Sequence, residues 1–132
     1  MIEHLQDPII LAQLLKENGK MIVEVPNAND ALLTIFKNKS YQDFIYWSAH
    51  LYYFTPNTLR KLGEKAGLKV DFVKGIQRYP FSNNLYWLAF GKPAGEKEWK
   101  NFIDDALFQK NWESTLASLG ATDTLIACFR AK

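Results

Sequence analysis

The chain of 132 residues has a single cysteine, Cys128, which excludes an intramolecular disulfide. One thiol and two histidines are also too few for a structural zinc site with four cysteine or histidine ligands. A chain without disulfides is typical of a reducing compartment, so we expect a cytoplasmic location. Cys128 stands in an apolar, strand-like segment, which predicts packing rather than nucleophilic chemistry for its thiol.

Long apolar runs and a surplus of one charge are lacking as well. No stretch approaches the roughly 18 consecutive apolar residues of a membrane-spanning helix, and the first residues do not form a secretory signal. Sixteen basic residues against fourteen acidic ones give a net charge of +2, too small to attract nucleic acid or anionic lipid. The aromatic segment 41–54 contains no lysine or arginine, unlike single-strand nucleic-acid platforms. Neither a membrane nor a nucleic acid is therefore expected as a partner.

The composition that is present, 48% hydrophobic and 23% charged residues, fits a globular chain with one core. No Gly/Ser-rich linker and no internal repeat divides the sequence. We therefore expect a single domain over residues 1–132.

The spacing of the apolar residues predicts a mixed α/β fold in which helices cover a sheet. Strands are expected at 20–25, 68–76 and 123–130, and helices at 7–18, 30–37, 55–66 and 96–119, whereas 83–91 fits either. Glu24 is the only polar break in its apolar strand, which predicts a strand covered on both faces in a mainly parallel sheet. The final strand is expected to run antiparallel to its neighbours.

Four phrases along the chain point to a known family. Residues 2–8 read IEHLQDP, 17–27 read ENGKMIVEVPN, 50–55 read HLYYFT and 123–130 read DTLIACFR. In this order they resemble the carboxy-terminal half of class I S-adenosylmethionine-dependent methyltransferases, in particular a bacterial subgroup associated with small-molecule, quinone or surface-polysaccharide modification. The resemblance implies a Rossmann-like sheet that ends in an antiparallel hairpin.

The half of such an enzyme that binds the cofactor has no counterpart in these residues. In the family a Gly-x-Gly turn and a ribose-binding acid hold S-adenosylmethionine, and the seven glycines of this chain form no Gly-x-Gly. The resemblance thus implies the acceptor-binding part of a methyltransferase, not catalytically complete alone. S-adenosylmethionine and a small-molecule acceptor are expected only in the complete enzyme. The alternative is a non-enzymatic binding or interaction module from a truncated methyltransferase-like gene.

Glu3 and His4 are candidate metal ligands. In some related methyltransferases an E-x-x-E-H run with a distant histidine binds a divalent metal that lowers the pKa of the acceptor hydroxyl. Glu3 and His4 match the last two positions of that run, and His50 is a candidate for the distant ligand. The first glutamate would fall before Met1, so the set is incomplete. The alternative is that both residues only cap the following helix or belong to a frayed chain start.

His50 is the candidate catalytic residue, because a histidine can accept a proton from the acceptor near neutral pH. The alternative is a partly buried histidine that only hydrogen-bonds to backbone. Aromatic residues and loop polar groups beyond strand ends are typical of an apolar pocket with a few polar anchors. The predicted acceptor-binding residues are Asn27, Trp47, Tyr52, Tyr53, Arg78, Tyr79, Asn83 and Asn84.

A homodimer is expected from the resemblance. In the family, the strand that corresponds to 20–25 lies between the fourth and the seventh strands. Without the fourth strand, the backbone groups along one edge of 20–25 have no partner, and such an edge is a template for another chain. We expect pairing along this edge or through the apolar helix face beside it.

Overall fold

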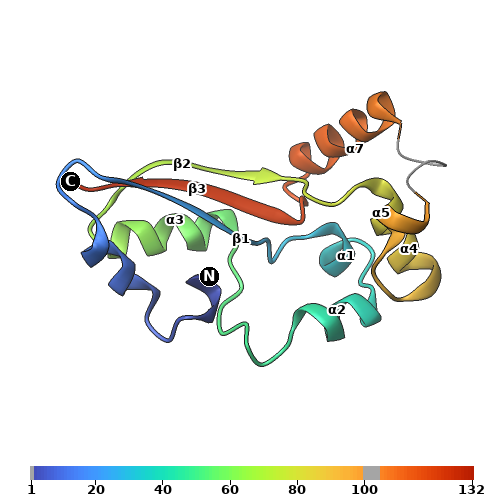
Figure 1. Ribbon diagram of the computed structural model, residues 1–132, viewed down its shortest axis with the longest axis horizontal. Helices are drawn as coiled ribbons and strands as arrows, with labels where there is room; N and C mark the ends of the chain where they lie inside the picture. Colours follow the sequence, from blue (N-terminus) through green and yellow to red (C-terminus); the bar gives the residue numbers. More distant parts are fainter. Residues whose placement is uncertain (1, 100–104) are drawn as a thin grey trace.

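The structure, a computed structural model, describes residues 2–99 and 105–132 and has a three-stranded sheet at its centre (Figure 1). The strands are β1 (Lys20–Pro26), β2 (Lys69–Ile76) and β3 (Thr124–Arg130), in the order β1-β3-β2. Both neighbouring pairs are antiparallel, which confirms the direction predicted for the final strand. The expectation of a mainly parallel sheet around residues 20–25 is wrong for the described residues, because the only neighbour of β1 there is β3.

Short helices occupy most of the rest of the described chain. They are η1 (Ile2–His4) and η2 (Pro8–Leu14), both 3-10 helices, and α1 (Ala31–Thr34), α2 (Lys39–Ile45), α3 (Pro56–Lys65), α4 (Phe81–Phe90), α5 (Gly95–Glu98) and α7 (Ala106–Ser118). The segment 83–91, which fitted a helix or a strand, is helical and ends at Gly91 with φ +65°, a left-handed conformation that glycine adopts without strain. None of the helices in the described ranges is long and apolar enough to cross a membrane.

Three helix predictions require correction. The helix expected at 30–37 is the shorter α1, which ends at Thr34. The helix expected at 7–18 is the shorter η2, because Leu15 is extended and donates its N–H to the carbonyl of Ala12, three residues earlier. The helix expected at 96–119 is divided: α5 ends at Glu98, and the Asp105 carboxylate accepts two backbone N–H groups that open α7. The apolar positions 102 and 103 of that prediction lie outside the described residues.

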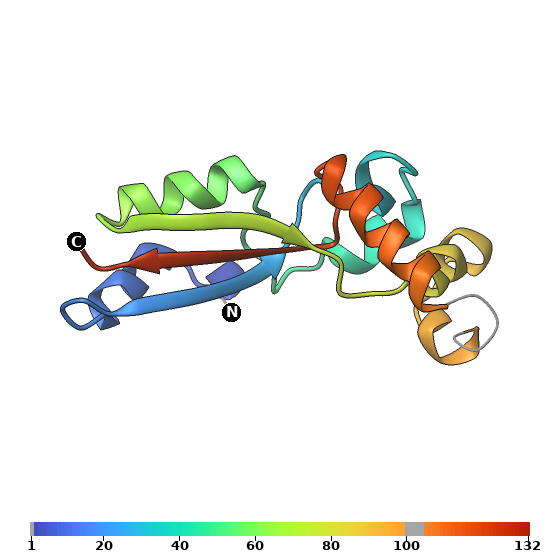
Figure 2. The same ribbon diagram turned by 90° about the horizontal axis from the view of Figure 1, so that it is seen from above.

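In the described part of the chain, helices cover one face of the sheet along its length, whereas α7 reaches the opposite face only at the carboxyl end of β2 (Figure 1). Beneath the sheet, α3 and η2 pack against its core-facing side chains (Figures 1 and 2). On the opposite face Ile22, Cys128 and Phe72 are neighbours in the strand register, and Ile22 is 61% exposed. The prediction that residues 20–25 are covered on both faces is therefore wrong for the described structure.

The second structural region lies beyond the carboxyl ends of β1 and β2. There α1, α2 and α4 enclose a small core around Leu32, Leu33, Tyr41 and Trp87. A bridge between Asn27 and Phe54 joins the segment after β1 to the segment before α3. This bridge brings residues 50–54 close to the end of the sheet and positions the candidate site.

Candidate functional site

Glu3, His4 and His50 meet although 45 residues separate His4 from His50 in the sequence. The backbone carbonyl of Glu3 accepts the N–H of Leu51 at 2.7 Å and the N–H of Tyr52 at 3.3 Å. These bonds fasten η1 to the loop after α2, so the side chains of Glu3, His4 and His50 offer ligand atoms that lie within 4.8 Å of one another. The structure thus gathers the three residues that the sequence singled out as possible metal ligands.

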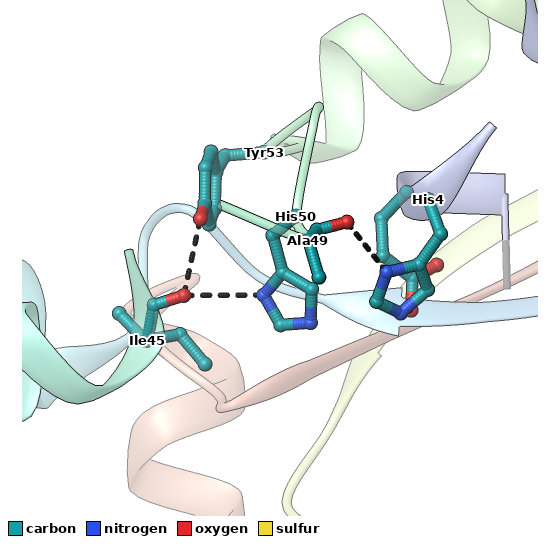
Figure 3. A network of polar contacts seen from close by, with 6 residues as sticks. His4, Ile45, Ala49, His50 and Tyr53 are labelled. Atoms are coloured by element: carbon teal, nitrogen blue, oxygen red, sulfur yellow. Dashed lines mark hydrogen bonds and ion pairs between the residues drawn. The ribbon is translucent and has the colours of Figure 1, made fainter. Parts of the chain in front are cut away.

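Both imidazoles are oriented by backbone carbonyls (Figure 3). Nδ1 of His4 lies 2.6 Å from the carbonyl oxygen of Ala49, and Nδ1 of His50 lies 3.1 Å from that of Ile45. The hydroxyl of Tyr53 donates to the same Ile45 oxygen at 3.0 Å. A carbonyl oxygen can only accept, so each Nδ1 carries the hydrogen, and a neutral ring then has its lone pair on Nε2. Nε2 is the atom available to a metal or to a proton.

Glu3 is a buried carboxylate, 7% exposed, with an oxygen 3.3 Å from Nε2 of His4. Burial alone would raise its pKa, but hydrogen bonds to the carboxylate are the main cause that holds that pKa below its ordinary value. Two imidazole nitrogens and one carboxylate form a donor set that suits borderline divalent metals. Ligands about 2.1 Å from a tetrahedral metal lie about 3.4 Å apart, so separations of up to 4.8 Å would have to shorten by about 1.4 Å at most to close the set around an ion.

A cavity of about 640 Å³ lies at the carboxyl ends of β1 and β2, with Glu3 in its wall. Its aromatic lining consists of Tyr41, Phe44, Tyr79 and Trp87, and its polar lining consists of Glu3, Glu24, Arg78, Asn83, Glu96, Asp123 and Thr124. The carboxyl ends of parallel strands are where α/β proteins place their ligands, and β1 and β2 run in the same direction because both are antiparallel to β3. The cavity is the strongest candidate for a small-molecule site.

The charged groups of this cavity hold one another in place. The Arg78 guanidinium donates to both oxygens of Glu24, with Nε at 2.7 Å from one of them. The Asp123 carboxylate accepts the backbone N–H groups of Arg78 and Tyr79, each at 2.9 Å. Burial raises the pKa of Asp123, although these hydrogen bonds oppose the shift. The loop after β2 is thus fixed to the start of β3, which places Arg78 and Tyr79 in the wall.

Asp30 and Tyr41 form a buried pair behind the aromatic wall. The Tyr41 hydroxyl donates to one Asp30 oxygen at 2.8 Å, and the other oxygen accepts the N–H of Leu32 and caps α1. Burial, more than these hydrogen bonds, sets the pKa of Asp30 and raises it to about 6. Burial also raises the pKa of the Tyr41 hydroxyl, and the nearby Asp30 carboxylate raises it further.

A protein-family model described as a methyltransferase domain matches residues 1–72. The chain belongs to this family. The matched part of the methyltransferase domain runs from η1 into β2 and includes Glu3, His4 and His50, whereas the cavity residues of α4 and β3 lie beyond it. No curated protein matches the sequence.

The methyltransferase domain brings only some of the predicted acceptor-binding residues to the cavity. Arg78, Tyr79 and Asn83 line it, whereas Asn27, Trp47, Tyr52, Tyr53 and Asn84 are not part of its wall. Asn27 is 2% exposed, and its amide binds the carbonyls of Gly120 and Thr122 and the N–H of Asn29, so it closes the turn after β1. The Tyr52 hydroxyl donates to the Gln6 carbonyl, as that of Tyr53 does to Ile45. Trp47, 52% exposed, lies against the rings of His4 and His50.

Most wall residues were not among the predicted site residues, and they include Glu24, Trp87, Glu96 and Asp123. The sequence could have indicated two of them as site residues. Glu24 is the polar break near the end of an apolar strand, and Asp123 directly precedes the last strand. No sequence pattern indicated Trp87 or Glu96 as site residues, because their position at the cavity depends on how α4 and α5 pack together.

Proposed function

We propose that this methyltransferase domain is the acceptor-binding part of an S-adenosylmethionine-dependent methyltransferase, and that residues outside this sequence supply the cofactor-binding part. The observation that carries the proposal is the cavity at the carboxyl ends of β1 and β2, whose wall includes Glu3 of the Glu3, His4 and His50 group. The two histidines lie next to Glu3 and are not part of the described lining. Its volume of about 640 Å³ lies in the usual range for small-molecule sites. Family membership supports methyl transfer as the reaction class.

In the proposed reaction, an acceptor atom attacks the sulfonium methyl group in line, and its electron pair forms the new bond to the methyl carbon. The bond from carbon to sulfur breaks, its electrons stay on sulfur, and a proton leaves the acceptor. We assign that proton to Nε2 of His50, because its Nδ1 is already engaged with the Ile45 carbonyl. Holding the acceptor in line would contribute most of the rate increase.

We also propose Glu3, His4 and His50 as ligands of a divalent metal ion. When bound, such an ion supplies Lewis-acid chemistry that lowers the pKa of an acceptor hydroxyl. The donor set fits, because backbone carbonyls fix both imidazoles and leave Nε2 of each for coordination. Nε2 of His50 has one lone pair, so the metal and the base assignments exclude each other at any one moment.

The test is reconstitution. The chain is co-expressed with the product of a neighbouring reading frame that encodes a strand, a Gly-x-Gly turn and a helix, and transfer of labelled methyl from S-adenosylmethionine to small molecules is measured. We expect transfer by the pair and neither transfer nor cofactor binding by the chain alone, because the Gly-x-Gly turn is absent. In the pair, His50→Ala should lower kcat with cofactor affinity nearly unchanged.

Micromolar binding of S-adenosylmethionine by the chain alone in calorimetry would contradict the proposal. So would a folded pair without any transfer. Loss of folding in His50→Ala, measured by circular dichroism, would make His50 a structural residue instead. The absence of a suitable reading frame would favour the non-enzymatic module.

A further inference from the structure

The cavity wall carries more negative than positive charge. Glu3, Glu24, Glu96 and Asp123 contribute carboxyl groups, and Arg78 is the single cationic side chain in the lining that the structure describes. Two of the five N–H groups of the Arg78 guanidinium bind Glu24, so the positive charge of Arg78 is balanced by that carboxylate. The remaining carboxyl groups would repel an anionic ligand and attract a cationic one.

Glu96 contributes a carboxylate to the lining of this cavity. Its Oε2 atom is buried and has no hydrogen-bond partner in the described chain. A buried carboxylate oxygen without a donor is costly, because it has lost its water without replacement. Because Oε2 has no donor in the described chain, the Glu96 carboxylate would attract a positively charged group of a ligand in the cavity that this side chain lines.

The aromatic part of the wall favours the same kind of ligand. The Trp87 ring lies 5.0 Å from Tyr41 and 5.1 Å from Phe44 between ring centroids, and the three side chains all line the cavity. Phe44 is 56% exposed, so part of the ring remains accessible to a ligand. Aromatic faces attract ammonium groups through their quadrupoles and also bind the apolar part of a ligand.

We propose that the acceptor bound in this cavity is a small molecule carrying an ammonium group, recognised by Glu96 and the aromatic wall of Tyr41, Phe44 and Trp87. The ammonium group is the recognition element, and the methylated atom is a separate group of the same molecule. This inference rests on the proposed acceptor role of the cavity and narrows its ligand to cations.

The test uses three probes with the same phenol ring and different charge: tyramine is cationic, 4-ethylphenol is neutral and 3-(4-hydroxyphenyl)propanoate is anionic. Binding to the full chain at pH 7 is measured by calorimetry and by tryptophan fluorescence, to which Trp87 in the wall contributes. We expect tyramine to bind about tenfold tighter than 4-ethylphenol, and the anion not to bind measurably. Raising the salt concentration should weaken only tyramine binding.

Glu96→Gln removes the charge and keeps the shape of the side chain, and it should lower tyramine affinity about tenfold while leaving 4-ethylphenol unchanged. The matched control is Glu98→Gln, which changes an exposed glutamate of the same helix outside the cavity lining and should alter neither affinity. If Glu96→Gln fails to fold, the charge series and the salt dependence of the unmodified chain still decide the outcome.

Equal or weaker binding of tyramine than of the neutral or anionic probe would overturn the inference, as would failure of all three probes to bind at ten millimolar. A folded Glu96→Gln variant with the charge preference intact would also overturn it. These measurements need no methyl donor. A chain that prefers tyramine but never supports methyl transfer after reconstitution would contradict the proposed function and leave the cation preference standing.

Discussion

The orientation of His4 and His50 comes from carbonyl groups of the loop after α2, and Glu3 completes the set. If the three residues hold a metal, the chain should bind Co²⁺ with the visible absorption of a low-coordinate nitrogen and oxygen site. Glu3→Gln and His50→Ala should each weaken Co²⁺ binding at least tenfold, because one of three protein ligands is lost.

The control for this metal prediction is Glu17→Gln, an exposed carboxylate on the turn before β1 that should leave Co²⁺ affinity unchanged. Absorption titration and calorimetry measure the affinities. Equal Co²⁺ affinity in all variants would place bound metal elsewhere and contradict the assignment of these ligands.

Asp30 predicts a pH dependence of stability. The folded chain holds the Asp30 proton up to about pH 6, whereas the unfolded chain releases it near pH 3.8, so the unfolding free energy should fall as pH rises through this interval. The expected decrease is on the order of 3 kcal/mol. Asp30→Asn, which keeps a capping side chain, should flatten the profile, whereas the exposed cap Asp105→Asn should not. Urea unfolding from pH 4 to 7 measures both, and an Asp30→Asn variant whose stability changes with pH as much as that of the unmodified chain would contradict the assignment.

At the scale of single residues, the sequence identified candidate metal ligands by their residue type, but it did not predict the hydrogen bonds that bring them together. Glu3, His4 and His50 were recognisable as residue types, but their meeting depends on hydrogen bonds from Leu51 and Tyr52 to one backbone carbonyl. No side-chain pattern encodes such bonds. Asn27, a loop polar residue by sequence, has an amide fully used in closing a turn, and that too depends on the fold.

At the scale of elements, the sequence predicted correctly those features that depend on hydrogen bonds between residues close together in the chain. The helix predicted at 55–66 is α3, and the Thr55 hydroxyl caps its first turn. The last strand followed from its alternation and pairs with both other strands. The length of η2, and the division between α5 and α7, depend on where a helix stops hydrogen bonding, and apolar spacing does not report this.

The close packing of α3 against the sheet can be tested by a substitution at Gly63. A Cβ on Gly63 would lie 2.4 Å from the ring of Phe129, which is buried in the core beneath the sheet. Gly63→Ala should therefore destabilise the fold by about 1–3 kcal/mol, although alanine favours helices by about 1 kcal/mol over glycine. The control Glu64→Ala, at an exposed position of the same helix, should change stability by less than about 0.5 kcal/mol. Thermal and urea unfolding measure both variants, and a more stable Gly63→Ala would contradict this packing.

At the scale of the whole molecule, the edge of β1 is the feature that most affects association. Hydrogen bonds from Ala131 to Gly19 and from Asn27 to Asp123 mark the paired positions of the β1·β3 ladder. Because paired and unpaired positions alternate along an antiparallel ladder, the backbone groups of Lys20, Ile22 and Glu24 point to the open edge. The described residues provide no strand for that edge.

We propose that two copies of the chain pair antiparallel along this edge, with Ile22 at the two-fold axis. This register sets Lys20 opposite Glu24 of the second copy, so opposite charges meet twice while the outward N–H and C=O groups of both strands are satisfied.

Light scattering at about 100 µM should give a dimer, and Ile22→Lys should give a monomer, because it places two like charges at the axis. Phe72→Lys puts the same charge on the same open face but on β2, so it should leave the dimer intact. Hydrogen exchange should protect the amides of Ile22 and Glu24 in the dimer only. A monomer at that concentration would contradict the pairing, and dissociation by Phe72→Lys would show that the copies associate through the open face instead of the edge.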